Sequence, residues 1–247
     1  MHVNGDPSLP GWGPFQSRHY LRRYAVAGDA WDVALALPPS LAQAEVAPAL
    51  LIVLDGSIHF EAMAATVAAL ERRSEKTMVG PTVIVGIASG IGWTHDSARR
   101  IEAFVPGETA HAHFSDLICG TLMPELSSLF ALDPARCGIF GHSFGGVFAL
   151  DVALRMPELF GAAIAVSPSL WRAPDLFGGA ASPPTRGQRI LLASGEREPD
   201  RINDPLRETV GRLEQRGREA RYLLMPDEDH GSVPFTVMPA ALRLLHR

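Results

Sequence analysis

Six short, mainly apolar runs are the feature that most constrains how this 247-residue chain can fold. They are continuously apolar and do not alternate, which is typical of strands buried on both faces of a parallel sheet. Segments with helical spacing separate them, so the order is strand, helix, strand, helix. The predicted strands are Ala49–Leu54, Thr82–Ala88, Cys137–Phe140, Gly161–Val166, Ile190–Ala193 and Tyr222–Met225.

The segments between these runs predict five helices, and the first part of the chain predicts a hairpin. Two loosely alternating stretches, Tyr20–Ala27 and Trp31–Leu37, indicate antiparallel strands at one edge of the sheet. Asp204 is the predicted N-cap and Pro205 the first-turn residue of the fourth helix, which Gly217 would end. The predicted helices are Glu61–Arg73, Phe114–Leu129, Gly145–Met156, Pro205–Arg216 and Thr236–Leu245.

No linker, repeat or low-complexity tract divides the chain. We therefore predict one α/β domain over residues 1–247, with a mainly parallel sheet, helices on both faces and an antiparallel N-terminal edge. Residues 1–14 are expected to form an irregular N-terminal segment. The longest irregular stretches, 89–113 and 168–187, each follow a predicted strand, where α/β sheets place their ligands.

Composition excludes several classes of function. A net charge of −5 indicates no nucleic-acid partner and no stable membrane association. No leader segment or long apolar stretch is evident, so we expect a cytoplasmic protein. Two cysteines and scattered histidines do not have the spacing of a metal site, and no phosphate-binding glycine motif is present. We therefore expect no metal and no cofactor, whereas the oligomeric state stays open.

The motif that carries chemistry is Gly141-His142-Ser143-Phe144-Gly145, a G-x-S-x-G between a predicted strand and a predicted helix. In this context the serine occupies a tight turn at the carboxyl end of the sheet, where we expect both flanking glycines to be required sterically. The N–H of Phe144 would then face an oxyanion formed at Ser143. The motif therefore predicts a nucleophilic serine.

A serine hydroxyl needs a general base, and chain order selects the candidate. In hydrolases of this kind the histidine follows the last strand, where only His230 and His246 lie. We expect His230 to be the base, because it lies in a loop, whereas His246 is the penultimate residue of a predicted helix. The acid should follow the strand that ends at Ala193, where Glu198 is the first candidate. Glu196, Asp200 or no acid at all remain alternatives.

A second oxyanion donor is expected in the loop after Ala49–Leu54. Gly56 allows the backbone to turn its amides inward, and the N–H of Ser57 is the predicted donor. The alternative is that Asp55-Gly56 is only a turn.

These motifs, taken in order, resemble the "Putative esterase" family of α/β-hydrolases, in the branch of the enterobactin and salmochelin esterases. The resemblance extends from about Phe15 to the end of the chain. The residues that carry it are Val53-Leu54-Asp55-Gly56, Asp133-Pro134-Ala135-Arg136, Gly141 to Gly146, Ser167-Pro168-Ser169-Leu170-Trp171, Gly195-Glu196-Arg197-Glu198 and Asp229-His230-Gly231-Ser232.

The resemblance implies a serine carboxylic-ester hydrolase that acts on a small-molecule ester, either of the siderophore type or another aryl or acyl ester. It implies Ser143 as nucleophile, His230 as base and an acid near Glu198. It also implies that Arg100 and Trp171 contact substrate, although Ala103 and Val105 depart from the family pattern around Arg100. Three alternatives remain: an acyltransferase, a thioester hydrolase and a non-catalytic binding protein on the same fold.

Overall fold

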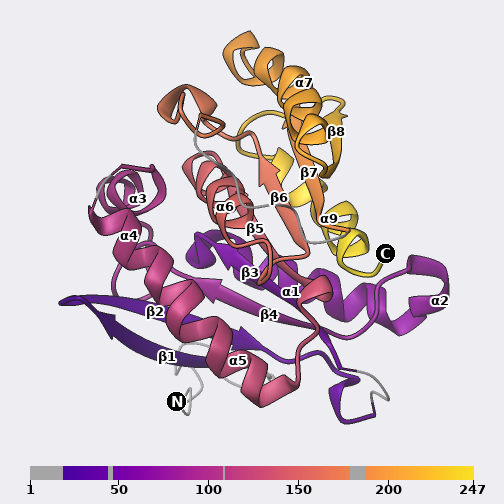
Figure 1. Cartoon of the computed structure of the whole chain (residues 1–247). Coiled ribbons are helices and arrows are strands. Elements are labelled where there is room, and N and C mark those ends of the chain that lie inside the picture. The colour runs from indigo at the N-terminus through magenta and orange to yellow at the C-terminus, as the bar shows by residue number, and fades with distance from the viewer. Residues whose placement is uncertain (1–18, 44–46, 108, 179–186) are drawn as a thin grey trace, which may run out of the picture.

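A computed structural model describes residues 19–43, 47–107, 109–178 and 187–247. The predicted irregular segment 1–14 lies outside these residues. Eight strands form one sheet in the order β1-β2-β4-β3-β5-β6-β7-β8 (Figure 1). The strands are β1 (His19–Val26), β2 (Asp29–Ala36), β3 (Ala49–Leu54), β4 (Thr82–Ile87), β5 (Cys137–His142), β6 (Ala162–Val166), β7 (Arg189–Gly195) and β8 (Glu219–Met225).

The predicted sheet is confirmed. The β1–β2 and β2–β4 pairs are antiparallel, and every other pair, from β4 through β8, is parallel. Every residue of β3, β4, β6 and β7 is buried, which explains their continuous apolar sequences. In contrast, β1 is an exposed edge strand, and its alternation of polar and apolar residues is correspondingly loose.

Helices cover both faces of the sheet (Figure 1). One apolar core lies between the sheet and α1, α8 and α9, and the other lies beneath α3 to α7. The helices are α1 (Gly56–Leu70), α2 (Ser74–Thr77), α3 (Ser97–Phe104), α4 (Thr109–Asp116), α5 (Met123–Phe130), α6 (Phe144–Arg155), α7 (Asp200–Gln215), α8 (Val233–Thr236) and α9 (Met238–Leu245). A π-helical stretch, Leu117–Leu122, joins α4 to α5.

Several helix boundaries differ from the prediction, most clearly at the starts of α1 and α7. The helix α1 begins at Gly56, directly after β3, and not at Glu61. The helix α7 begins at Asp200 after the N-cap Pro199, so Pro205 lies inside it and Asp204 is not its cap. A proline removes one helical hydrogen bond, but burial of Ile202, Leu206 and Leu213 along one side of α7 stabilises the longer helix.

The stretch predicted as irregular, 89–113, contains α3 and the beginning of α4. Asp96 caps α3 by accepting a hydrogen bond from the N–H of Arg99. Because α3 is mostly polar with only Ala103 and Phe104 buried, its sequence does not show the broad apolar stripe by which a helix is recognised.

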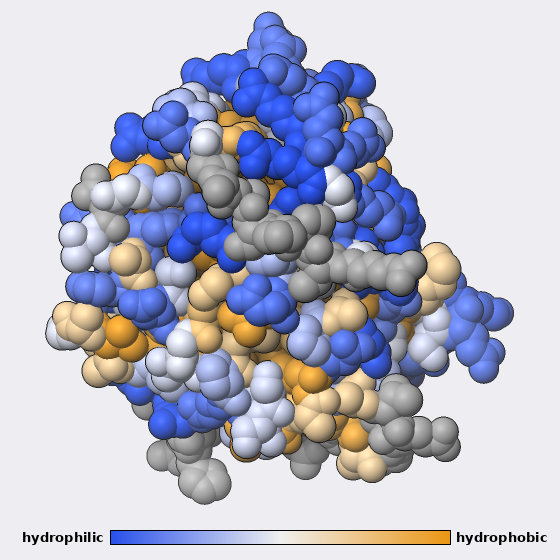
Figure 2. Space-filling view, viewed as in Figure 1, coloured by the Kyte–Doolittle hydropathy of each residue, from blue (hydrophilic) through white to orange (hydrophobic). Residues whose placement is uncertain are grey.

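The surface differs between the two ends of the view. Hydrophilic residues dominate over α7 at the top of Figure 2, and apolar residues are more frequent in the lower half. Among the described residues, no helix is long and apolar enough to cross a bilayer. The same residues contain no cluster of His, Cys, Asp and Glu arranged to hold a metal ion.

Candidate active site

The turn between β5 and α6 gives Ser143 an unusual backbone conformation. Its φ of 58° and ψ of −115° lie outside the regions that ordinary residues favour. A side chain at Gly141 would collide with the carbonyl group of Gly145, and one at Gly146 would come within 3.1 Å of Pro168 Cβ. This close packing holds the strand, the turn and the helix together, so that Ser143 sits at the carboxyl end of the sheet.

Gly145 does not have the steric role expected from the motif. A Cβ on Gly145 would lie 3.5 Å from the nearest atoms, which is ordinary van der Waals contact. The expectation that both flanking glycines are required by sterics is therefore wrong for Gly145. One residue later, a Cβ on Gly146 would lie 3.2 Å from the carbonyl oxygen of Val166 on β6, which is a tighter contact.

His230 and Glu198 form a close pair although they are 32 residues apart in the chain. Nδ1 of His230 lies 2.7 Å from Oε2 of Glu198. The Glu198 side chain is completely buried, whereas that of His230 is 43% exposed. Of the three acids considered, Glu198 contacts His230, while Glu196 and Asp200 are exposed. Glu196 accepts a hydrogen bond from the N–H of Asp227.

Hydrogen bonds keep the Glu198 carboxyl group ionised. Burial by itself would raise the pKa of Glu198, but the hydrogen bonds from His230, from the Ser167 hydroxyl and from the Gly195 N–H together lower it below its usual range. An ionised Glu198 is an acceptor for the Nδ1–H of His230. It therefore favours the tautomer in which Nε2 of His230 can accept a proton.

Two further histidines lie next to this pair and are kept neutral. The ring of His142 lies 4.4 Å from the ring of His230, centroid to centroid, and the ring of His59 lies 5.9 Å from that of His142. Burial lowers the pKa of His142 well below its ordinary value and that of His59 to about 4. The neutral rings place no positive charge beside His230 at neutral pH.

The two expected oxyanion donors lie at the N-termini of helices. Phe144 is the first residue of α6, and Ser57 is the second residue of α1, where amides have no acceptor within the helix. Asp55 caps α1 in the left-handed conformation, and its carboxylate lies 3.5 Å from the position that a Cβ would take on Gly145. The beginning of α1 and the beginning of α6 are thus neighbours.

Arg100 lies at this junction. Its Nε and Nη2 donate hydrogen bonds of 2.7 and 2.8 Å to the two carboxylate oxygens of Asp55, which is 1% exposed. Nη2 also lies 3.5 Å from the carbonyl oxygen of His142. Arg100 thus contacts the residue that precedes α1 and the residue that ends β5. Its positive charge is neutralised by the carboxylate of Asp55.

Trp171 lies in the short 3-10 helix Leu170–Arg172 after β6. Its side chain is 47% exposed, and the guanidinium of Arg201 on α7 lies 5.5 Å from its ring centroid. Trp171 lines a separate pocket of about 270 Å³ between the loop after β6 and α7. Its expected contact with substrate stays a prediction, as does that of Arg100.

Sequence reasoning missed the part that Ser167 and Ser169 play. Ser167 has a φ of 45° and donates its hydroxyl hydrogen bond to Glu198. Oγ of Ser169 lies 3.2 Å from Oγ of Ser143, and the Ser169 N–H donates to the Ser143 carbonyl. The sequence feature that could have predicted these contacts is the Ser-Pro-Ser that directly follows β6. Because β6 pairs with β5, the residues after β6 come close to the Ser143 turn.

Comparison with known proteins identifies the family. Residues 25–226 match the family described as "Putative esterase". The chain belongs to this family. The esterase is 34% identical over 222 residues to the ferri-bacillibactin esterase BesA of Bacillus subtilis, covering 78% of this chain and 77% of the relative. It is 27% identical over 232 residues to the siderophore enterobactin esterase of Emericella nidulans, covering 73% of this chain and 76% of the relative.

Solved structures share the fold. The BES protein from Bacillus cereus has a TM-score of 0.79 at 22% identity, with 97% of this chain and 99% of that chain covered. The enterobactin and salmochelin hydrolase IroE has a TM-score of 0.74 at 20% identity, with the same coverage. The α/β-hydrolase fold and the family resemblance are thereby confirmed. The protein is an esterase, and small-molecule esters are the substrates of its family.

Proposed function

We propose that the esterase is a serine hydrolase of siderophore-type esters that uses Ser143, His230 and Glu198. The observation that carries this proposal is the 2.7 Å contact between the partly exposed His230 and the fully buried Glu198, beside the strained turn of Ser143. A buried ionised carboxylate that contacts only one nitrogen of an imidazole leaves the other nitrogen available as a base.

In the proposed mechanism, Nε2 of His230 takes the proton of the Ser143 hydroxyl while Oγ attacks the ester carbonyl carbon. The N–H groups of Phe144 and Ser57 stabilise the oxyanion of the tetrahedral intermediate. Each such donor typically increases kcat by a factor of about 10²–10³. His230 then gives the proton to the leaving alcohol, and an acyl group remains on Ser143.

Water completes the cycle. His230 takes a proton from a water molecule as that water attacks the acyl-enzyme carbonyl carbon. The second tetrahedral intermediate then collapses: the bond to Oγ of Ser143 breaks, His230 returns the proton to Oγ, and the acid is released. Glu198 stays ionised throughout and stabilises the imidazolium form of His230. The buried, neutral His142 and His59 add no positive charge that would oppose this imidazolium.

The substrate class rests on the relatives. BesA is described as a ferri-bacillibactin esterase. A relative from Aspergillus fumigatus is described as a siderophore triacetylfusarinine C esterase. It is 30% identical over 131 residues, which cover 49% of this chain and 44% of the relative. Together with the Emericella nidulans relative, these names favour an ester of a siderophore over an unrelated aryl or acyl ester.

A fluorophosphonate probe tests the nucleophile. We expect the wild-type protein and a Ser169→Ala variant to be labelled, and a Ser143→Ala variant to remain unlabelled. The Ser169 variant is the matched control because it removes a hydroxyl 3.2 Å from that of Ser143. Labelling of Ser143→Ala at the wild-type rate, or no labelling of the wild type, would contradict the proposed nucleophile.

A substrate panel tests the reaction. We expect release of monomer units from a catecholate trilactone and from a hydroxamate ester of the fusarinine type, faster than hydrolysis of a thioester of equal acyl length. Preferential transfer of the acyl group to an added alcohol would instead identify an acyltransferase. Preference for the thioester would identify a thioester hydrolase, and an inert Ser143 a binding protein.

A further inference from the structure

The Ser-Pro-Ser segment (residues 167–169) contacts both the proposed acid and the proposed nucleophile. It directly follows β6, and its three residues are buried. The Ser143 N–H donates to the carbonyl of the last residue of β6, and the Ser167 N–H donates to a carbonyl of β7. Because β6 lies between β5 and β7, the segment lies between the strand that leads to Ser143 and the strand that leads to Glu198.

Ser167 holds one oxygen of the Glu198 carboxylate. Its hydroxyl donates to Oε1, which also accepts a hydrogen bond from the N–H of Gly195, while Oε2 contacts Nδ1 of His230. Ser167 makes this contact from the left-handed region, at a φ of 45°, which residues other than glycine seldom adopt. Backbone strain of this kind persists only where the surrounding structure fixes it. The strained residue is thus the one whose side chain orients the acid.

Ser169 holds the nucleophile through two contacts. Its N–H donates to the Ser143 carbonyl at 3.1 Å, and its Oγ lies 3.2 Å from Oγ of Ser143. Across the described part of the chain, no hydrogen bond joins Ser143 Oγ to His230. Contacts between a nucleophile and its base commonly tighten only when substrate binds. In this state of the protein, Ser169 is therefore the residue that orients the Ser143 hydroxyl.

Pro168 fixes the separation of the two serines. Its ring restricts its own backbone, and it packs against α6, where a Cβ on Gly146 would lie only 3.1 Å from Pro168 Cβ. The two serine hydroxyls are therefore carried by one restrained segment, which is packed against the helix that follows Ser143.

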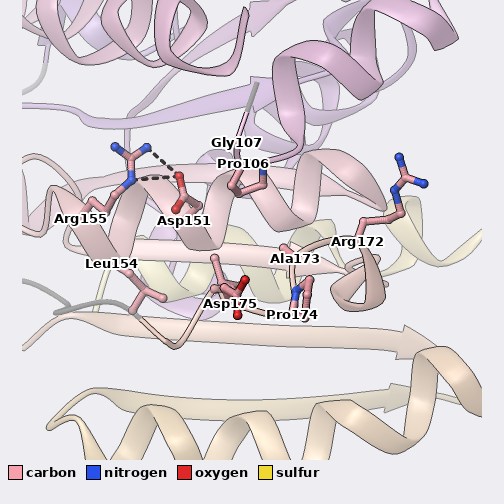
Figure 3. Close-up of a pocket in the computed structure, with 10 residues that line it drawn as sticks. Pro106, Gly107, Asp151, Leu154, Arg155, Arg172, Ala173, Pro174 and Asp175 are labelled. Carbon is pink, nitrogen blue, oxygen red and sulfur yellow. Dashed lines mark hydrogen bonds and ion pairs between the residues drawn. The ribbon is translucent and has the colours of Figure 1, made fainter. Parts of the chain in front are cut away.

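Beyond Ser169 the chain leads to a different part of the molecule. Ala173 and Asp175 line a pocket of about 350 Å³ beside Asp151, which lies in the second half of α6 (Figure 3). The guanidinium of Arg172 is directed away from this pocket. Asp175 thus offers a control position a few residues beyond the Ser-Pro-Ser segment.

We propose that the Ser-Pro-Ser segment positions the acid and the nucleophile relative to each other, with Ser167 acting through Glu198 and Ser169 acting through Ser143. The inference rests on the proposed function, since it concerns the groups assigned there. When substrate binds, Ser143 donates a hydrogen bond to Nε2 of His230, and the Ser169 hydroxyl donates to Ser143 Oγ and keeps it directed at the ester carbonyl. The Ser167 hydroxyl keeps Glu198 turned toward Nδ1 of His230.

Two substitutions of Ser167 separate the effect of its hydroxyl from that of its backbone. Glycine adopts a φ of 45° without strain, so Ser167→Gly should unfold at a higher temperature than Ser167→Ala. Both should lower kcat for a neutral ester about 10- to 100-fold with little change in KM, because a hydrogen bond to a charged group has about that value. A wild-type kcat in Ser167→Gly, or a change confined to KM, would overturn the proposal.

Ser169→Ala removes the other hydroxyl. We expect kcat to fall about three- to tenfold, the value of one neutral hydrogen bond, and fluorophosphonate labelling of Ser143 to proceed more slowly. Two controls should stay within about twofold of the wild type. They are Ser115→Ala, which removes a buried hydroxyl on α4, and Asp175→Asn in the pocket of Figure 3. A wild-type kcat in Ser169→Ala, or an equal loss in either control, would overturn the proposal.

A double-mutant cycle tests whether Ser167 acts through Glu198. Ser167→Gly, Glu198→Gln and the combined variant are compared by kcat with one neutral ester. The combined variant should agree with Glu198→Gln within about twofold, because the Ser167 hydroxyl has little left to position once the carboxylate is gone. Losses that multiply would show an independent role for Ser167 and overturn the assignment.

Proton NMR separates this proposal from the proposed function. An imidazole N–H that is hydrogen-bonded to a carboxylate resonates far downfield, and the Nδ1–H of His230 should give such a signal in Ser143→Ala. Adding Ser167→Gly should shift this signal upfield or broaden it, whereas adding Ser115→Ala should leave it unchanged. A signal that Ser167→Gly does not alter would overturn the role of Ser167, whatever the hydrolytic activity. Hydrolysis by Ser143→Ala at the wild-type rate would overturn the proposed function instead.

Discussion

Arg100 and Asp55 form a buried ion pair in which the guanidinium also reaches the carbonyl oxygen of His142. The pair therefore links the N-cap residue of α1 to the end of β5, the two positions that directly precede the segments with the expected oxyanion donors. A charge already neutralised by Asp55 attracts an anionic substrate weakly. This contact favours a positioning role for Arg100 over the substrate contact that the family resemblance implies.

Replacing Arg100 tests that role. Arg100→Gln should lower kcat about 10- to 100-fold for neutral and anionic esters alike, with KM changed little, because misplaced donors stabilise the transition state less. The unpaired Asp55 should also reduce the free energy of unfolding by about 3–5 kcal/mol. Arg100→Gln combined with Asp55→Asn should recover much of that stability, as thermal unfolding can measure. A rise in KM for the anionic ester alone would instead assign Arg100 to substrate binding.

The two glycines of the turn should respond differently to alanine. Gly141→Ala introduces a collision with the backbone of Gly145, so we expect loss of activity together with a large loss of stability. Gly145→Ala adds a methyl group at ordinary contact distance in a helix and should fold with nearly wild-type stability. Circular dichroism melts and fluorophosphonate labelling measure both effects. Equal damage from the two substitutions would contradict the described packing.

Substitution of the acids identifies the partner of His230. Glu198→Gln keeps the shape of the side chain but turns a donor or a neutral oxygen toward Nδ1, so kcat should fall by about 10²–10⁴. Glu196→Gln is the matched control, because Glu196 is exposed and accepts a hydrogen bond from the Asp227 N–H, which a glutamine oxygen can also accept, and kcat should stay within about twofold. Steady-state kinetics with one neutral ester decide the outcome. A larger loss in Glu196→Gln would refute the assignment.

The buried His59 should make stability depend on pH. Burial lowers the pKa of His59 to about 4 in the folded state, compared with about 6.5 in the unfolded chain. The negative charge of Asp55 raises this pKa, and the positive charges of Arg100 and His95 lower it further. Between these values the unfolded state binds more protons, so the free energy of unfolding decreases as pH falls from about 6.5 to 4. His59 should account for about 3 kcal/mol of that loss.

His59→Phe isolates this effect, since phenylalanine fits the aromatic surroundings of Phe140 and Phe235 without titrating. Urea unfolding between pH 4 and 7 should show a flatter profile for this variant than for the wild type. The partly exposed His113 on α4 provides the control as His113→Gln, whose profile should follow the wild type. An unchanged slope in His59→Phe would show that other groups cause the dependence.

Much of the sheet could be predicted because its strands are buried on both faces. The boundaries of β3 agree with the apolar run that predicts them, and β4 ends one residue earlier than its run. Helix boundaries were harder, since α3 has little apolar surface and α7 tolerates Pro205 by packing against the sheet. The acid partner of His230 was also hard to choose, because Glu196, Glu198 and Asp200 all lie in the loop after β7 and the sequence does not show which of them the loop turns toward His230.

Local patterns and chain order were enough to predict the parallel sheet, the Ser143 turn and the positions of His230 and Glu198 after successive strands. These features follow from burial, from backbone sterics and from the fact that parallel strands end at one edge. Only the tertiary structure decided which atoms meet. It paired Glu198 with His230, Ser167 with Glu198 and Arg100 with Asp55, because residues distant in sequence become partners only when the strands and helices that carry them pack together.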